Sequence, residues 1–208
     1  MTRKYRYTTD FARFLLGLRS AQSSVTESEQ RFLAELAADR AAVIEVGVHE
    51  GATSRVLRYA MNRDGRLFLV DPYLKAVRLE KLLGISFSEH IARRTLSSCK
   101  QGVTFIKDFS SRAADLLVGS VRADLIFIDA VHDYDAVTED FLKWRRLLED
   151  DGIIAFHDSR VCECRPDLPP GAGPVRLVED IRQGRYGAWE ICGEVDTVTA
   201  VKRVAKCR

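Results

Sequence analysis

Two glycines and two acidic residues in the first half of the chain have the types and spacing of a ligand-binding turn. In "VIEVGVHEGAT", residues 43–53, an apolar run carries Glu45 and then breaks at Gly47 and Gly51. The next apolar run along the chain ends at Asp71. Glycine lets the backbone turn sharply and approach a ligand closely, and a helix that starts after Gly51 would point its free N–H groups at the same place. These residues therefore predict a ligand at the ends of the first two strands, with carboxylates beside it.

The residues of this turn argue against two common phosphate ligands. The turn ends Gly51-Ala52-Thr53 rather than Gly-Lys-Ser/Thr, which disfavours a nucleoside triphosphate, and it has two glycines where the dinucleotide fingerprint has three. Acidic neighbours suit a ligand with a positive centre better than a pyrophosphate. Asp71, at the end of the second strand, can accept hydrogen bonds from both hydroxyls of a ribose. An adenosine that carries a positive sulfur, S-adenosylmethionine, satisfies both conditions.

A second group of reactive side chains follows two later apolar runs. "ADLIFIDAVHDYDAV" places Asp129 and His132 after one run, and "GIIAFHDS" places His157 and Asp158 after the other. Because the carboxyl ends of parallel strands meet at one edge of a sheet, we expect these side chains to lie together. Two carboxylates and two imidazoles could hold a divalent cation. They could equally supply a general base, since imidazole titrates near neutral pH.

The order of apolar and helical segments predicts an α/β fold. From Ala41 onward five apolar strands alternate with helices, which indicates a mainly parallel sheet covered on both faces. "AWEICGEVDTVTAVKRV" is typical of two further strands joined by a short turn. We therefore expect a doubly wound, mainly parallel seven-stranded sheet with a C-terminal antiparallel hairpin. Residues 1–39 are expected to form an N-terminal helical cap, and residues 40–208 the ligand-binding domain.

Two helices carry recognisable signals. Thr26 followed three residues later by Glu29 is a capping-box pattern, which predicts that a helix begins there. A later helix is expected over residues 135–150. It carries a core-facing stripe at helical spacing, formed by Val137, Phe141, Trp144 and Leu148.

Composition and charge limit the partners. The 208 residues are 46% apolar and 30% charged, with a net charge of +2, which gives no strong attraction to nucleic acid or to an anionic membrane. No apolar run approaches the roughly 18 residues that cross a bilayer. The five cysteines are scattered, which is unlike a secreted disulfide framework and favours a reducing cytoplasm. Cys162 and Cys164 form a single Cys-x-Cys pair, which alone is a weak zinc pattern.

Taken together, these residues resemble the class I S-adenosylmethionine-dependent methyltransferases over most of the chain. "VIEVGVHEGATS" is similar to their glycine-rich motif, "LFLVDPY" to their ribose-binding strand end, and "VTFIKDFSSRAADLL" to the segment that lies along the adenine. The resemblance implies S-adenosyl-L-methionine as the cofactor. It assigns cofactor binding to Glu45, Gly47, Gly51, Asp71, Asp108, Phe109 and Asp129.

Within this class the second group of side chains resembles the metal-dependent O-methyltransferases of sugars and phenols, including the macrolide-sugar enzymes. "IDAVHDY" is similar to their Asp-x-x-His-x-Tyr segment, and "AFHDS" to their strand end with an acidic pair. The resemblance implies catalytic roles for His132, as general base, and Asp129. It also implies a metal, Mg²⁺ or Mn²⁺, on Asp129, His157 and Asp158. His157 stands where these enzymes have a carboxylate, and imidazole is softer than Mg²⁺ prefers, so Mn²⁺, Fe²⁺, Zn²⁺ or no metal at all stay open.

The predicted function is methyl transfer from S-adenosylmethionine to the hydroxyl of a small-molecule acceptor, a sugar or a phenol, by a cytoplasmic protein without nucleic-acid or membrane partners. Two other functions stay open: a non-catalytic domain that binds the nucleoside, and an enzyme of the same fold with a hydroxylase-like reaction. The N-terminal helices and the loop over residues 160–174 are expected to cover the acceptor pocket. The sequence leaves open the identity of the acceptor and the oligomeric state, a homo-oligomer included.

Overall fold

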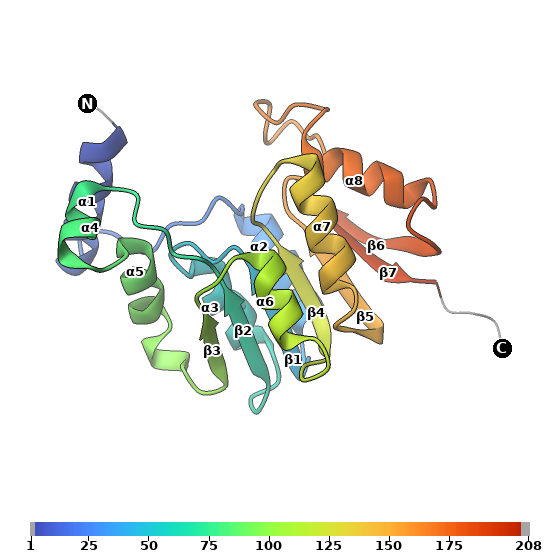
Figure 1. The fold of residues 1–208 in the computed structure, drawn as a ribbon, viewed down its shortest axis with the longest axis horizontal. Coiled ribbons are helices and arrows are strands. Elements are labelled where there is room, and N and C mark those ends of the chain that lie inside the picture. The colour runs from blue at the N-terminus through green and yellow to red at the C-terminus, as the bar shows by residue number, and fades with distance from the viewer. Residues whose placement is uncertain (1–2, 205–208) are drawn as a thin grey trace.

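A single sheet runs through the described residues in the strand order β3-β2-β1-β4-β5-β7-β6 (Figure 1). The structure is a computed structural model that describes residues 3–204, with side chains from Tyr7 onwards. The strands are β1 (Ala42–Val46), β2 (Arg66–Val70), β3 (Val103–Ile106), β4 (Ala123–Ile128), β5 (Leu148–Phe156), β6 (Trp189–Val195) and β7 (Val198–Arg203). The first five are parallel, and β7 runs antiparallel to both β5 and β6. This confirms the predicted doubly wound sheet of seven strands with a C-terminal antiparallel hairpin.

Helices cover both faces of the sheet (Figure 1). One face packs against α2 (Glu27–Ala37), α3 (Ala52–Ala60) and α5 (Phe87–Thr95). The other packs against α6 (Ser110–Leu117), α7 (Tyr134–Trp144) and α8 (Gly173–Arg182). Helix α1 (Arg3–Leu15) contacts α5, and α4 (Arg78–Leu83), which the sequence did not predict, lies towards the same end of the molecule. None of the helices in residues 3–204 is long and apolar enough to cross a membrane.

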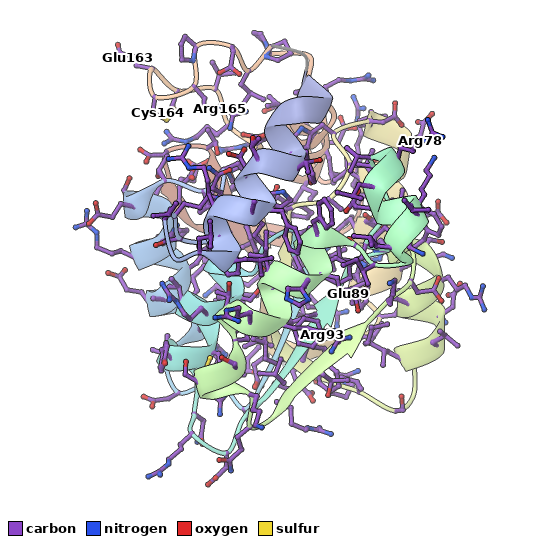
Figure 2. All side chains as sticks on the ribbon, turned by 90° about the vertical axis from the view of Figure 1, so that its left-hand side faces the viewer. Arg78, Glu89, Arg93, Glu163, Cys164 and Arg165 are labelled. Carbon is purple, nitrogen blue, oxygen red and sulfur yellow. A yellow bond between two sulfur atoms is a disulfide. The ribbon has the colours of Figure 1, made fainter. Side chains whose placement is uncertain are left out.

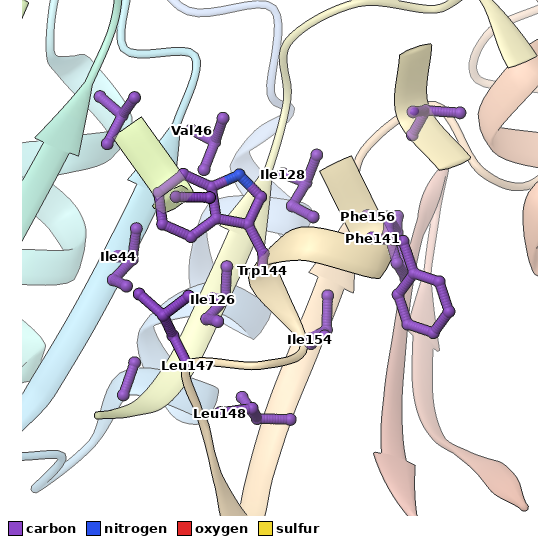
Figure 3. Packing of buried hydrophobic residues seen from close by; sticks show 14 of the residues in the cluster. Ile44, Val46, Ile126, Ile128, Phe141, Trp144, Leu147, Leu148, Ile154 and Phe156 are labelled. Carbon is purple, nitrogen blue, oxygen red and sulfur yellow. The ribbon is translucent and has the colours of Figure 1, made fainter. Parts of the chain in front are cut away.

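Alternate residues of the central strands face two separate cores. In β1, Ile44 packs on the side of α6 and α7, whereas Val43 packs on the side of α2 and α3. Figure 3 shows Trp144 and Phe141 of α7 against the strand residues, with Ile126 among them, and all three side chains are fully buried. Truncating such a buried aromatic to Ala costs about 3–5 kcal/mol. This packing holds α7 on the sheet and so fixes the ends of β4 and β5.

Helix α7 ends earlier than its apolar stripe predicts. Val137, Phe141 and Trp144 are buried as expected, but the helix ends at Trp144 rather than near residue 150. Leu148 already belongs to β5, where it pairs with Ala123 of β4. The prediction that Leu148 belongs to a helix was wrong. An apolar residue is compatible with a buried strand as well as with a helix stripe, and here pairing with β4 selects the strand.

The predicted capping box at the start of α2 is confirmed. The Thr26 hydroxyl accepts the Glu29 N–H at 3.2 Å, and the Glu29 carboxylate accepts the Thr26 N–H at 2.8 Å. Further along α2, Leu33 and Ala37 are fully buried in the core that contains β1. The predicted division of the chain after residue 39 stays a prediction.

The cysteines differ from the expectation of reduced thiols at one place. A disulfide joins Cys162 to Cys164 in the loop between β5 and α8, which lies at the top of Figure 2. The turn between them brings their Cα atoms to 5.3 Å, a separation at which a disulfide can form. Cys99 and Cys192 are free thiols, and Cys207 lies outside the described residues.

Candidate functional site

A cavity of about 710 Å³ opens at the carboxyl ends of β1, β2 and β4, where the strand order reverses. In open α/β sheets this crevice is the usual ligand site. Six of the residues predicted for the site line it: Glu45, Gly47, Asp71, Phe109, Asp129 and His132. The other predicted residues, Gly51, Asp108, His157 and Asp158, do not line it.

The glycine turn after β1 has no room for a side chain at its first glycine. Gly47 has a φ of +91°, and a Cβ there would come within 1.9 Å of the Asp129 carbonyl oxygen. Gly51 has a φ of +75° and caps the start of α3, and a Cβ there would lie 3.2 Å from the Ala92 Cα. Both glycines are therefore required by backbone geometry, Gly47 for a close approach of two chain segments and Gly51 for the start of the helix.

Asp71 fastens this turn to the end of β2. Its Oδ2 accepts the N–H groups of Val48 and His49, both at 3.0 Å, and its Oδ1 accepts the Tyr73 N–H at 2.7 Å. The amides of the turn therefore donate to Asp71 rather than to Glu45, which by its position in the sequence could have accepted them. A carboxylate has about four acceptor sites, so Asp71 can hold the turn and still face the cavity, which it lines.

Glu45 lies on the cavity wall without a charged partner. Its side chain is buried, and no described residue gives a hydrogen bond to its Oε2. Burial raises the pKa of Glu45 to about 8, and the neighbouring carboxylates of Asp129 and Asp71 contribute to the rise. At neutral pH the group is therefore a neutral acid that a nearby cation would ionise.

Phe109 lines the cavity and is exposed, whereas Asp108 does not line it. The Asp108 carboxylate accepts the Phe109 N–H at 2.9 Å and pairs with Arg112 at 3.2 Å. Asp108 thus sets the backbone that carries Phe109. The Ser110 hydroxyl, which also lines the cavity, donates to Asp140 and accepts from the Trp144 indole N–H.

Behind Asp129, a buried imidazole lies between two carboxylates. His157 Nδ1 is 3.0 Å from Asp129 Oδ1, and His157 Nε2 is 3.5 Å from Glu29 Oε2. Burial alone would lower the pKa of His157, but the carboxylates of Asp129 and Glu29 raise it to about 10. Burial would likewise raise the pKa of Glu29, yet contacts with His157 and Thr197 lower it to about 2. The row Glu29–His157–Asp129 therefore carries an imidazolium between two carboxylates at neutral pH.

Asp158 is surrounded by cationic and imidazole groups. Its Oδ2 lies 3.4 Å from His132 Nε2, and its carboxylate pairs with Arg165 at 3.2 Å. Arg165, labelled in the loop at the top of Figure 2, reaches Asp158 from the proline-rich segment between β5 and α8. Asp158 itself is 1% exposed. No pattern in the sequence indicates the Arg165 contact.

The side chains that could share a metal ion are not quite the predicted set. Ligand atoms of Asp129, His132 and His157 all lie within 4.8 Å of one another. Asp158, predicted as a ligand, is not part of this group. The residues fit a divalent ion that accepts nitrogen ligands, provided that His157 gives up the proton between Nδ1 and Asp129.

The N-terminal segment completes the cavity, through residues that the sequence did not single out. Gln22, Ser23 and Ser24 line the wall, and the Ser23 and Thr53 hydroxyls are 2.9 Å apart. This segment is anchored by a two-bond ion pair between Arg19 and Glu50, at 2.6 and 2.8 Å. These contacts join residues that are distant in the chain, so only the folded structure reveals them.

Comparison with solved structures identifies the fold. The O-methyltransferase TomG from Streptomyces achromogenes, solved with S-adenosylmethionine, has a TM-score of 0.62 and 16% identity, over 99% of this chain and 100% of that one. A Bacillus cereus O-methyltransferase in complex with S-adenosylhomocysteine has a TM-score of 0.64 and 14% identity, over 94% and 90%. An rRNA methylase from Streptococcus thermophilus has a TM-score of 0.56 and 12% identity, over 88% and 100%. The fold is that of the class I S-adenosylmethionine-dependent methyltransferases.

A family match goes further than the fold. The family model described as a methyltransferase domain matches residues 44–159, more than half of the chain. The chain therefore belongs to this methyltransferase family, and the matched residues include the glycine turn, Asp71, Asp129 and Asp158. No curated protein sequence matches the chain. The protein is thus an S-adenosylmethionine-dependent methyltransferase.

Proposed function

We propose that the protein transfers the methyl group of S-adenosylmethionine to a hydroxyl of a small molecule, with a sugar or a phenol as the acceptor class. One observation carries the proposal. Among the described residues that line the cavity, three carry carboxylates, Glu45, Asp71 and Asp129, and none is Lys or Arg. Such a wall suits a ligand with a cationic centre, and the sulfonium of S-adenosylmethionine is one.

The donor would lie across the ends of β1 and β2. Asp71 keeps acceptor sites for the ribose hydroxyls, Glu45 and Asp129 face the positive end, and the exposed ring of Phe109 offers a surface for the adenine. Gly47 allows the backbone to approach the ligand. Gly51 and Asp108 support the donor indirectly, because they set the start of α3 and the backbone of Phe109.

His132 would act as the general base. Its Nε2 lies 3.4 Å from Asp158 Oδ2, so a ring with its proton on Nε2 would keep the lone pair of Nδ1 for the acceptor's proton. The acceptor oxygen forms a bond to the methyl carbon as the carbon–sulfur bond breaks. The sulfonium becomes the neutral thioether of S-adenosylhomocysteine, and the hydroxyl proton passes to His132. The nearby carboxylate of Asp158 stabilises the imidazolium that results.

A divalent ion is the alternative aid to the same reaction. Held by Asp129, His132 and His157, it would lower the pKa of a bound hydroxyl. His132 could not then serve as the free base, so the two mechanisms are distinguishable. With the base mechanism, the rate is unchanged by a chelator and by added Mg²⁺ or Mn²⁺. With the metal mechanism, the chelator abolishes turnover and Mn²⁺ restores it.

The acceptor is proposed to be small because of the charge at the cavity. Two of the structural neighbours are named as rRNA methylases, but proteins that bind RNA neutralise its phosphates with Lys and Arg. The described lining of this cavity has neither. A lining without Lys or Arg offers no partner for the phosphates of a polynucleotide, whereas an uncharged sugar or phenol needs none.

The test is transfer of a labelled donor methyl to a panel of catechols, phenols and sugars. His132→Ala should lower the rate about 10²-fold, while the binding of S-adenosylhomocysteine stays within twofold. His90→Ala is the matched control, because this exposed histidine of α5 lies away from the cavity. A non-catalytic binding domain would label no acceptor, and a hydroxylase-like enzyme would release a product without the donor methyl. Either result, or an unchanged rate for His132→Ala, would overturn the proposal.

A further inference from the structure

We infer that Glu29 is a positioning residue for methyl transfer: through the ring of His157 it fixes the carboxylate of Asp129 at the cavity wall. This inference rests on the function proposed for that cavity. Glu29 belongs to α2 and does not line the cavity. The sequence indicates only a capping role for it.

The side chains of Glu29, His157 and Asp129 form a row that extends from α2 to the cavity. Glu29 is 0% exposed and His157 is 2% exposed, and they face each other at 3.5 Å. The other ring nitrogen of His157 meets Asp129 at 3.0 Å. The Asp129 side chain, 18% exposed, is the member of the row that faces the cavity. The orientation of the ring is therefore set from one end by Glu29 and used at the other end by Asp129.

Glu29 receives more donors than a capping residue needs. Its two oxygens face the Thr26 N–H at 2.8 Å, the Thr197 N–H at 2.8 Å, the Thr197 hydroxyl at 2.6 Å and His157 Nε2 at 3.5 Å. A capping box accepts Gln as readily as Glu. A carboxylate, which accepts at both oxygens and donates at neither, suits these three hydrogen-bond donors and the imidazole of His157 at ion-pair distance, because the amide of Gln would direct its own N–H groups at some of them. Capping explains only the Thr26 N–H, and the contacts with Thr197 and His157 lie beyond it.

The backbone of Asp129 is already fixed, so its side chain is the part that needs a partner. The Asp129 N–H donates to the Val46 carbonyl at 2.8 Å, and its own carbonyl is packed against Gly47. His157 then selects where the carboxylate lies. Reacting groups must be aligned closely, and a shift of about 1 Å can cost about 10²-fold in rate.

Burying this row is not an efficient way to gain stability. Each charge removed from water costs several kcal/mol, and well-packed apolar side chains of similar size are often as stable or more so. A role in orienting a carboxylate at the reaction site gives a reason for the row that stability alone does not.

The test compares Glu29→Gln with Thr197→Val. Thr197→Val removes one hydrogen bond to the same carboxylate but leaves Glu29 and His157 in contact, so it should lower the melting temperature without changing kcat. Glu29→Gln should lower kcat at least tenfold on any hydroxyl acceptor that the wild type methylates, with a smaller change in KM for S-adenosylmethionine, because Glu45 and Asp71 still face the donor. A crystal structure of Glu29→Gln should show the contact between His157 and Asp129 broken. If Glu29→Gln does not fold, Glu29→Asp replaces it in the test. Its side chain is too short to reach His157, so we expect the same loss of kcat.

A double-mutant cycle separates positioning from simple support. In an Asp129→Asn background, Glu29→Gln should change the residual single-turnover rate less than twofold, because the group that it positions is already gone. Additive losses, an unchanged kcat, or an intact His157–Asp129 contact in the Glu29→Gln crystal would overturn the inference. If the wild type methylates no acceptor, the proposed function fails, and the crystal alone then decides whether Glu29 positions Asp129.

Discussion

The ends of β1 and β2 and the ends of β4 and β5 both bring predicted site carboxylates to one edge of the sheet, but only those after β4 and β5 have cationic or imidazole partners. Glu45 has no partner for its Oε2 in the described residues, and Asp71 is bonded to backbone amides. Asp158 pairs with Arg165 and lies beside His132, while Asp129 pairs with His157.

This difference separates a region prepared for a charged ligand from a region that balances its own charge. A cation that enters beside Glu45 and Asp71 meets carboxylates with no Lys or Arg of the described lining to compete for them. At the ends of β4 and β5 the carboxylates already orient imidazoles, which is the arrangement that proton transfer requires. The first region should therefore govern donor affinity, and the second should govern rate.

The greatest loss is expected at the closest contact of the first region. Gly47→Ala would place a Cβ 1.9 Å from the Asp129 carbonyl oxygen at a φ of +91°, so the turn must move. We expect the free energy of unfolding to fall by at least about 2 kcal/mol and the affinity for S-adenosylhomocysteine to fall about 100-fold. Denaturant unfolding and calorimetry measure the two. Gly171→Ala, at an exposed glycine with nothing within 4 Å, should change neither; normal ligand binding by Gly47→Ala would refute the role of the turn.

A smaller loss is expected when the acid that fastens the turn becomes an amide. Asp71→Asn leaves one oxygen to accept three backbone N–H groups, now from Val48, His49 and Tyr73, and directs its own N–H groups at donors. We expect the affinities for S-adenosylmethionine and S-adenosylhomocysteine to fall together, about 10–30-fold. Both ligands carry the same ribose, and both would lie against the same turn. Calorimetry with the two ligands checks this. A loss confined to one of them would mean that Asp71 does not act through the ribose or the turn.

Proton release on donor binding gives a second measure of the first region. Burial raises the pKa of Glu45 to about 8, with Asp129 and Asp71 adding to the rise, so the free protein holds this proton at pH 7. A sulfonium nearby favours the ionised form and lowers that pKa, so binding releases a proton. Affinity for S-adenosylmethionine should therefore rise as pH increases from about 6 to about 8 and then level off. Phosphate and Tris differ in their ionisation enthalpy, so calorimetry at pH 7 in the two buffers measures the number of protons released on binding. We expect up to one proton for the wild type, and we expect the contribution of this site to be absent in Glu45→Gln.

The weakest effect is expected in the loop beside the second region. The Cys162–Cys164 disulfide closes a ring with one residue between its ends, so it removes little freedom from the unfolded chain. Replacing both cysteines with Ser should shift the melting temperature by no more than about 2 °C and leave donor affinity unchanged. A large fall in kcat would instead make this loop part of the acceptor site. Thermal unfolding and initial rates distinguish the two outcomes.

The first region could be predicted from the sequence because its signals are local. Nearly continuous apolar runs define β1 and β2, and the glycines of the turn and Asp71 follow directly in the chain, so the position of the cavity was predictable. The sequence did not predict which carboxylate accepts the N–H groups of the turn. Glu45 and Asp71 both lie near the turn in sequence or fold, and only the register of β1 on β2 decides that the amides donate to Asp71.

The second region depends on contacts between distant residues. Asp129, His132, His157 and Asp158 were expected together because their strands are adjacent, and the structure brings them together. The contacts of Glu29 and Arg165 with this region could not be predicted from the sequence. Glu29 has the pattern of a helix cap, and Arg165 has that of a loop residue. Their contacts arise when α2 packs against the sheet and the proline-rich loop folds back towards Asp158.

The other proposals all depend on whether the cavity at the ends of β1, β2 and β4 holds a cationic adenosyl donor. Titration of the wild type and of Glu45→Gln with S-adenosylmethionine and S-adenosylhomocysteine decides this. We expect one binding site in the wild type. We also expect Glu45→Gln to weaken S-adenosylmethionine about tenfold, about 1.4 kcal/mol, and the uncharged thioether less than threefold. Equal losses for the two ligands, or a wild type that binds neither, would show that the carboxylate wall does not recognise the sulfonium.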